Sequence, residues 1–165
     1  MIGLRSQTML RAFRALEADI CVAAVADPRY AQIAPEMKDD PYFAHTRWYE
    51  DAQELLARDD LDGVFIGTRC PLHTPLACRV LKTGMPLFLE KPVCISPEQY
   101  EALREAGRGQ EKRVVVSFPL RFSTITLEME ELVRSGSLGR LTMVQAVNNV
   151  PYGSVYYHRC LLYTS

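Results

Sequence analysis

Four short runs of apolar residues punctuate the first part of the chain. They are rich in β-branched residues and continuous rather than alternating, which is typical of strands covered on both faces of a sheet. The runs are Ile20–Ala26, Gly63–Gly67, Pro86–Leu89 and Val114–Phe118. We therefore expect four buried strands.

Between these runs, apolar residues recur at helical spacing. A first helix, which Ser6 can cap, carries an apolar face made of Met9, Leu10, Phe13 and Leu16. Two more helices are expected over residues 51–58 and 74–82, and Ser96 can cap a fourth. Strand and helix in alternation indicate right-handed βαβ units, and hence an α/β fold with a parallel sheet.

The pattern changes after Pro119. A helix is expected over Thr124–Arg134, and Leu141–Val150 has the mixed polarity of a longer strand. This change predicts two domains, one of residues 1–119 and the beginning of another over residues 120–165.

Composition and charge narrow the class of protein. The chain has 165 residues, 48% of them hydrophobic, and a formal net charge of -1. This balance gives no electrostatic reason to expect a nucleic acid or a membrane surface as partner. Neither a membrane-length apolar run nor a signal peptide is visible.

The cysteines fit a reducing compartment. There are five of them, scattered and without a CxxC pair. Such a set suits small side chains in a cytoplasmic protein better than disulfides or a zinc site. We expect a cytoplasmic protein that has no metal site.

Polar residues follow each predicted strand. Asp27 ends the first, Thr68 to His73 follow the second, Glu90-Lys91-Pro92 follow the third, and Arg121 comes shortly after the fourth. Lys and Glu are rarely buried unless they are paired. In parallel α/β sheets, ligands bind beyond the carboxyl ends of the strands. These four groups are therefore expected to meet at one edge.

The N-terminal residues contain part of a dinucleotide-binding pattern. If Gly3 is the first glycine of G-x-G-x-x-G, Leu4 and Arg5 follow it in the phosphate-binding turn. Asp27 lies where an acid would bind a ribose 2′-hydroxyl, which favours NAD over NADP. Arg29 weakens that preference, because it can pair with a 2′-phosphate. The alternatives are a simple turn glycine and an ordinary Asp-Pro turn.

The chain resembles the Gfo/Idh/MocA family of NAD(P)-dependent sugar dehydrogenases. The resemblance rests, in order, on IGLRSQTMLRAF, VADP, ELLARDDLDGVFIGT, the histidine of PLHTPLA, GMPLFLEKPV and RSGSLGRL. It implies a Rossmann domain followed by an open α+β substrate domain. The implied activity is hydride transfer between NAD(P) and a CH–OH group of a sugar, polyol or inositol.

The resemblance also implies roles for the residues after the third run. Lys91 matches the catalytic lysine, which lies beside the nicotinamide and holds the reacting hydroxyl. Glu90 resembles the residue that contacts the nicotinamide ribose, and Pro92 matches a proline that is commonly preceded by a cis bond. Acid–base assistance of this kind typically contributes about 10²- to 10⁴-fold to the rate.

A second cofactor loop is implied by Thr68, Pro71 and His73. Arg69 departs from the family pattern, as does the cysteine after it, where a Pro-Asn pair is usual. For His73 the alternative is a structural residue at the start of a helix. Arg121 resembles an arginine near the substrate, although a solvated arginine is an equal alternative.

Two departures from the family lead us to expect an incomplete, inactive fragment. Most of the first strand is missing, and the Asp and His that the second domain normally supplies have no counterpart. The full-length protein is expected to be a homo-oligomer. The alternative function is a non-catalytic module that binds a nicotinamide nucleotide or a partner, although the intact Glu90-Lys91-Pro92 favours an enzyme.

Overall fold

The computed structural model describes residues 1–3, 6–16 and 19–147. The chain divides into two compact units, Met1–Ser117 and Phe118–Ser165. The units are described one at a time, beginning with the larger.

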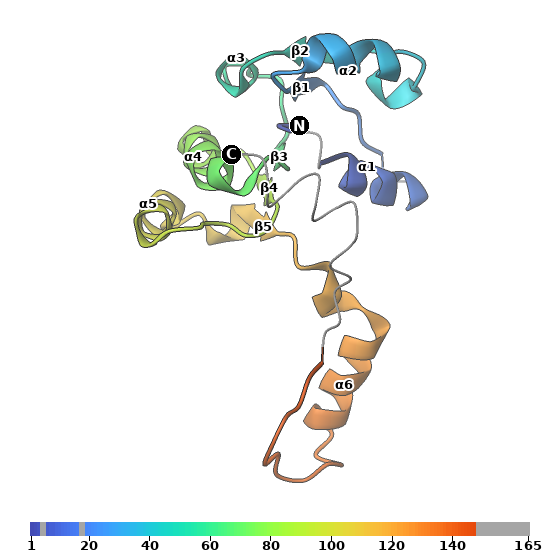
Figure 1. Cartoon of the computed structure of the whole chain (residues 1–165), viewed down its shortest axis with the longest axis vertical. Helices are drawn as coiled ribbons and strands as arrows, with labels where there is room; N and C mark the ends of the chain where they lie inside the picture. The colour runs from blue at the N-terminus through green and yellow to red at the C-terminus, as the bar shows by residue number, and fades with distance from the viewer. Residues whose placement is uncertain (4–5, 17–18, 148–165) are drawn as a thin grey trace. The chain divides into compact units, whose positions relative to one another are not determined.

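The first unit alternates helices with three-residue strands (Figure 1). Its helices are α1 (Ser6–Ala15), α2 (Tyr30–Met37), α3 (Ala52–Leu56), α4 (Cys70–Thr83) and α5 (Pro97–Gly107). Its strands are β1 (Ala24–Ala26), β2 (Arg47–Tyr49), β3 (Val64–Ile66), β4 (Leu87–Leu89) and β5 (Val114–Val116). Each of the four predicted strands is present in shortened form, and the predicted alternation with helices is confirmed.

All strand pairs are parallel, and they form two groups that a single residue joins. β1 pairs with β2, while β3, β4 and β5 form a three-stranded group. Ile2 bridges Ala26 of β1 and Ile66 of β3. The spatial order is therefore β2–β1–Ile2–β3–β4–β5, the doubly wound order of a dinucleotide-binding sheet. Met1–Gly3 supplies the central position as a bridge, in place of a full strand.

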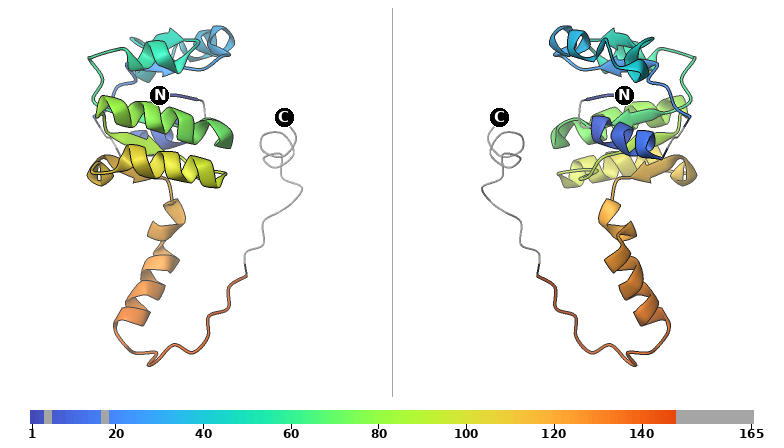
Figure 2. Two further views of the ribbon diagram at one scale, coloured as in Figure 1. Left: turned by 90° about the vertical axis from the view of Figure 1, so that its left-hand side faces the viewer. Right: turned by 90° about the vertical axis from the view of Figure 1, so that its right-hand side faces the viewer.

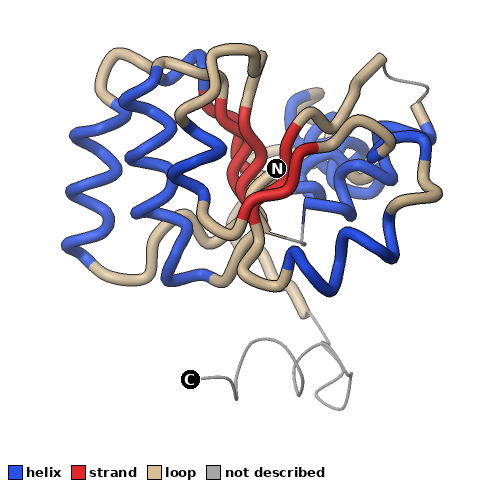
Figure 3. Tube along the Cα trace, turned by 90° about the horizontal axis from the view of Figure 1, so that it is seen from above, coloured by secondary structure: helices blue, strands red, loops and turns tan. Residues whose placement is uncertain are grey.

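Helices cover both faces of this sheet, as Figures 1 and 2 show. α3, α4 and α5 lie on one face, and α1 lies on the other. Figure 3 shows the same layering from above, with the strands between the helices. β1, β3 and β4 are covered on both faces and are apolar at every position, which explains their continuous runs in the sequence. The expectation of a buried strand is wrong for β5, which lies at the edge of the sheet and leaves Val115 58% exposed.

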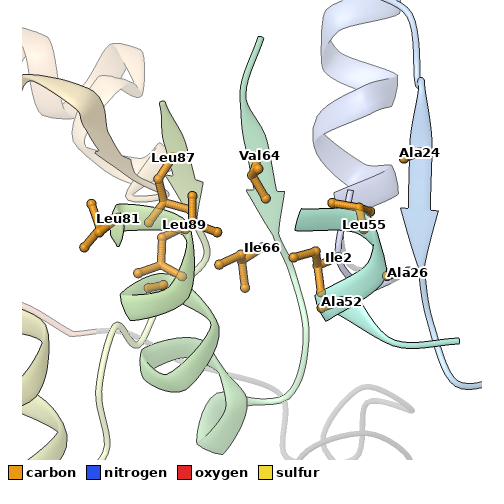
Figure 4. Close-up of a cluster of buried hydrophobic side chains, with 12 residues drawn as sticks. Ile2, Ala24, Ala26, Ala52, Leu55, Val64, Ile66, Leu81, Leu87 and Leu89 are labelled. Carbon is orange, nitrogen blue, oxygen red and sulfur yellow. The ribbon is translucent and has the colours of Figure 1, made fainter. Parts of the chain in front are cut away.

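The larger core cluster fills the face beneath α3 and α4. Val64, Ile66, Leu87 and Leu89 of the sheet are each at most 2% exposed. Ile2 lies between Ile66 and the α3 side chains Ala52 and Leu55 (Figure 4). A smaller cluster on the other face contains Leu10, Val22, Val25 and Phe43.

The sequence patterns missed β2 and α2. β2 is an edge strand whose first residue, Arg47, is exposed and whose other two are only partly buried. α2 contains Pro35, which is unfavourable inside a helix. Neither element has the apolar periodicity on which the other predictions rested.

The second unit contains the predicted helix at the predicted bounds. α6 spans Thr124–Arg134, and Ser123 caps it by accepting a hydrogen bond from the Thr126 N–H. The strand expected over Leu141–Val150 is wrong for residues 141–147, which have no regular structure. Residues 148–150 lie outside the described residues. Mixed polarity alone does not make a strand, because its backbone groups need a partner strand.

A charged contact fastens α1 to the segment after α2. Arg14 of α1 donates from Nη2 to both carboxylate oxygens of Asp40, at 2.6 Å each. Its guanidinium also lies 4.0 Å from the centre of the Tyr42 ring. The hydrogen bonds from Arg14 lower the pKa of Asp40 below its ordinary value.

We expect the stabilisation from Asp40 to depend on pH. A carboxylate with a lowered pKa in the folded state stabilises the fold above its unfolded pKa, and the contribution is lost as the pH falls through the folded value. Near neutral pH, Asp40→Asn should lower the free energy of unfolding by about 0.5–1 kcal/mol. The loss should fade below about pH 4. Urea unfolding across pH checks this, with the exposed neighbour Asp39→Asn as control. Identical pH profiles for the two variants would contradict it.

Candidate active site

Backbone hydrogen bonds hold the carboxyl ends of the strands side by side. The bonds run from Gly3 N to Ala26 O (3.0 Å), Gly67 N to Ile2 O (2.8 Å), Glu90 N to Ile66 O (3.0 Å) and Ser117 N to Leu89 O (2.9 Å). Each bond joins a residue just beyond one strand to the end of its neighbour. The polar residues that follow β1, β3 and β4 therefore share one edge of the sheet, as the sequence predicted.

Gly3 is at the centre of this edge in a conformation that requires glycine. Its φ is +82°, and a Cβ atom there would lie 2.6 Å from the Gly67 carbonyl oxygen and 2.7 Å from Cγ2 of Thr68. Other residues rarely adopt such a φ, and the backbone oxygen cannot swing aside. The turn after Met1–Gly3 thus passes directly against the end of β3. Leu4 and Arg5, the other predicted residues of this turn, lie outside the described residues.

Ser6, near the turn at Gly3, does not have the capping role that the sequence predicted. The helix begins at Ser6 itself, and the serine is 3% exposed. Its hydroxyl has no hydrogen-bond partner among the described residues, so it does not act as the expected cap. A buried, unpaired hydroxyl is costly unless a ligand completes it. At the N-terminus of a helix, a phosphate oxygen is a chemically suitable partner.

Asp27 follows β1 directly and is nearly buried. Its N–H donates to the Tyr49 carbonyl oxygen, which fixes the residue beside β2. One carboxylate oxygen accepts the Arg29 N–H at 2.9 Å and the Arg29 Nε–H at 3.3 Å. Asp27 is therefore an acid at a strand end, and its exposed arginine partner lies two residues away.

Glu90 and Lys91 continue β4 and differ sharply in exposure. Glu90 is 8% exposed and therefore nearly buried, whereas Lys91 is exposed. Among the described residues the Lys91 side chain has no ion pair or hydrogen bond, so its ammonium is available to a ligand. The Lys91–Pro92 peptide bond is cis, in agreement with the resemblance.

His73 is held inside the protein instead of facing the edge. It belongs to the first turn of α4 and is 1% exposed. Its Nδ1 lies 2.7 Å from the Pro92 carbonyl oxygen, and its Nε2 lies 3.1 Å from the Thr68 carbonyl oxygen. The sequence predicted His73 near the strand ends. It did not indicate that both ring nitrogens would contact backbone carbonyl groups.

The other residues of this loop lie around the start of α4. Thr68 is partly exposed, and Arg69, which is exposed, stands at the N-cap position. Pro71 is exposed in the first turn of the helix. Their predicted contacts with a cofactor remain predictions.

Arg121 belongs to the second unit, so its predicted place beside a substrate also remains a prediction. It lies in the short 3₁₀ turn Pro119–Phe122 and is exposed. In the part of the chain that the structure describes, no group of three His, Cys, Asp or Glu side chains is arranged to hold a metal ion. No helix in this part is long and apolar enough to cross a membrane.

Comparison with known proteins identifies the family. The model of the Gfo/Idh/MocA oxidoreductases, described as an oxidoreductase family with an NAD-binding Rossmann fold, matches residues 1–118. The chain belongs to this family. The glycine turn, Asp27 and the Glu90-Lys91-Pro92 segment all lie within the matched range, which ends next to the boundary between the two units.

Similar proteins include several dehydrogenases. The inositol 2-dehydrogenase of Corynebacterium glutamicum is 28% identical over 146 residues, which are 87% of this chain and 42% of that protein. Dehydrogenase aclE of Aspergillus oryzae is 30% identical over 112 residues, or 66% of this chain and 31% of that protein. The chain thus spans less than half the length of these relatives.

Solved structures share the fold. The myo-inositol dehydrogenase of Lactobacillus casei, crystallised in complex with NAD(H) and myo-inositol, superposes with a TM-score of 0.71 at 22% sequence identity. The match covers 84% of this chain and 41% of that one. This likeness supports the Rossmann architecture of the first unit.

The close approach at Gly3 leads to a prediction about stability. Gly3→Ala should cost about 1–2 kcal/mol for the positive φ and about 1–3 kcal/mol more for the collision with Gly67. Gly109→Ala is a matched control, because Gly109 has φ +75° and nothing within 4 Å of the added Cβ. Urea unfolding compares the two. Equal destabilisation would show that the contact with the end of β3 is unimportant.

Proposed function

We propose that the chain provides the nucleotide-binding unit and the catalytic lysine of an NAD(P)-dependent dehydrogenase. The proposed reaction transfers a hydride between the nicotinamide and a CH–OH carbon of a polyol, inositol or sugar. The observation that carries the proposal is the exposed Lys91 at the end of β4, on the same sheet edge as Gly3 and without a side-chain partner among the residues that the structure describes. Family membership makes a nicotinamide nucleotide the natural occupant of that edge.

The cofactor would extend along the strand ends. The turn that begins at Gly3 and includes Leu4 and Arg5 would approach the pyrophosphate, and the unpaired Ser6 hydroxyl would donate to it. Asp27 would accept hydrogen bonds from the adenosine ribose diol, which favours NAD. Thr68, Arg69, Pro71, Glu90 and Pro92 would line the path towards the nicotinamide.

Lys91 would accept the hydroxyl proton of the reacting alcohol, or donate it in the reverse reaction. A carbinol carbon releases a hydride readily only as its hydroxyl proton is taken up, and NAD supplies the hydride acceptor. Lys91 would hold the hydroxyl oxygen and receive the proton, which requires the amine in its neutral form at that moment. In the reverse direction the ammonium would donate a proton to the carbonyl oxygen.

The substrate class rests on the relatives. The protein of Corynebacterium glutamicum is named an inositol 2-dehydrogenase, and the Lactobacillus casei enzyme was crystallised with myo-inositol. Inositols are cyclic polyols with secondary hydroxyl groups, and a secondary hydroxyl is the group that the proposed Lys91 chemistry needs. We therefore place inositols first among the polyols and sugars to be tested.

Substitution of Lys91 tests the proposed chemistry. In an enzyme that carries this chain together with a substrate domain, Lys91→Ala should lower NAD-dependent oxidation of the active polyol by about 10²- to 10⁴-fold, because acid–base assistance is lost. NADH binding should persist, since the turn at Gly3 is intact. The exposed Lys112→Ala is the control. Full turnover by Lys91→Ala would refute the catalytic assignment. NADH binding without turnover, in a protein that carries the unaltered chain together with a substrate domain, would favour the non-catalytic module.

Asp27 leads to a prediction about cofactor choice. Asp27→Asn keeps the shape of the side chain but removes the charge that repels a 2′-phosphate and pairs with Arg29. We expect NADH binding to weaken about tenfold, as for loss of a charged hydrogen bond, and NADPH binding to strengthen. Adding Arg29→Ala should abolish the gain for NADPH. Tighter binding of NADPH than NADH by the unaltered chain would contradict the proposed role of Asp27.

A further inference from the structure

Two buried side chains of α4 hold the segment that follows Lys91. His73 contacts the Pro92 carbonyl oxygen, and the Thr74 hydroxyl donates to the Val93 carbonyl oxygen at 2.8 Å. Both side chains are nearly inaccessible, at 1% and 2% exposure. Consecutive residues of one helix turn thus bind consecutive carbonyl groups directly after the lysine.

The same cluster extends to the loop after β3 and to the start of α5. The second nitrogen of His73 faces the Thr68 carbonyl oxygen. Gln99 of α5 accepts the Ile95 N–H at 3.0 Å and donates to the Pro71 carbonyl oxygen at 3.2 Å. The two loops at the proposed nicotinamide end are therefore joined to each other through side chains.

We propose that His73 and Thr74 are positioning residues for Lys91. This inference rests on the proposed function, and it assigns His73 a different task from the cofactor contact that sequence resemblance implied. The Lys91 side chain has no partner of its own in the described part of the chain. Its location is set by its backbone, which His73 and Thr74 fasten to α4 one and two residues later.

The His73 imidazole is better suited to holding the backbone after Lys91 than to contacting a ligand. A neutral imidazole has one N–H, so it donates to one of the two carbonyl oxygens, and an imidazolium donates to both. In either form both ring nitrogens are already directed at backbone oxygens. Because the residue is also only 1% exposed, neither nitrogen is open to a nucleotide.

The test compares isosteric variants in the full chain. Thr74→Val removes the hydroxyl but keeps the shape, Thr74→Ser keeps the hydroxyl, and His73→Gln retains a donor that His73→Phe lacks. Thr83→Val, at the other end of α4, is the matched control, because the Thr83 hydroxyl donates to the Val80 carbonyl oxygen within its own helix. Thr74→Val provides the test if His73→Phe fails to fold.

Lys91 can be observed directly. The chain has four lysines, Lys38, Lys82, Lys91 and Lys112, whose amines can be ¹³C-dimethylated and resolved by NMR. Lys91→Arg assigns the Lys91 signal. We expect Thr74→Val and His73→Phe to shift or broaden this signal alone, whereas Thr74→Ser and Thr83→Val leave it unchanged and His73→Gln restores it in part. This comparison needs no nucleotide, so it remains valid if the proposed function fails.

Kinetics separate positioning from cofactor binding. In the active enzyme, Thr74→Val and His73→Phe should lower kcat on the order of 10- to 100-fold, because a displacement of about 1 Å has that effect, while NADH affinity is retained. Weakened NADH binding with an unchanged Lys91 signal would make His73 a cofactor contact and overturn the proposal. An unchanged Lys91 signal with unchanged kcat would overturn it as well.

Discussion

The sheet depends on one short backbone segment at its centre. Ile2 N donates to the Phe65 carbonyl oxygen, Gly67 N donates back to Ile2, and Ala26 N donates to Met1. These bonds join β1 and β2 to the three strands on the other side. The Ile2 side chain also completes the core between Ile66 and α3. Without this segment, two small sheets would each expose an unpaired edge.

The same constraint creates the candidate site. In a doubly wound sheet the connections turn away in opposite directions on either side of the central strand, which leaves a crevice at its carboxyl end. Gly3 lies at that point, and its tight approach to Gly67 follows from the central bonds of Ile2. The Ser6 hydroxyl, which has no hydrogen-bond partner in the described part of the chain, lies at the start of α1. Arg14 and Asp40 in turn fasten α1 to the segment after α2, so a contact outside the candidate site helps to hold the helix that begins at Ser6.

Much of this arrangement could be predicted because both faces of the sheet are covered. Burial on two sides produces continuous apolar runs, and parallel strands align the polar residues that follow them. β2 was not predicted because this edge strand lacks a continuous apolar run. α2 was not predicted because Pro35 is a residue that normally argues against a helix. The expected strand over residues 141–147 failed since local polarity does not supply a pairing partner. The unpaired Ser6 and the carbonyl partners of His73 depend on tertiary contacts, which spacing along the chain does not encode.

Burial along β4 explains why its charged residues lie where they do. Leu87 and Leu89 point into the core, and Glu90 remains nearly buried as the strand passes Ile66, to which its N–H donates. Lys91 is the first exposed residue after β4. The Lys91 side chain is long and flexible, so the region it can reach is set by where its backbone is held. In the proposed arrangement His73 and Thr74 hold that backbone through the carbonyl groups of the next two residues and not through the lysine itself. Such a clamp leaves all three ammonium hydrogens available for ligands.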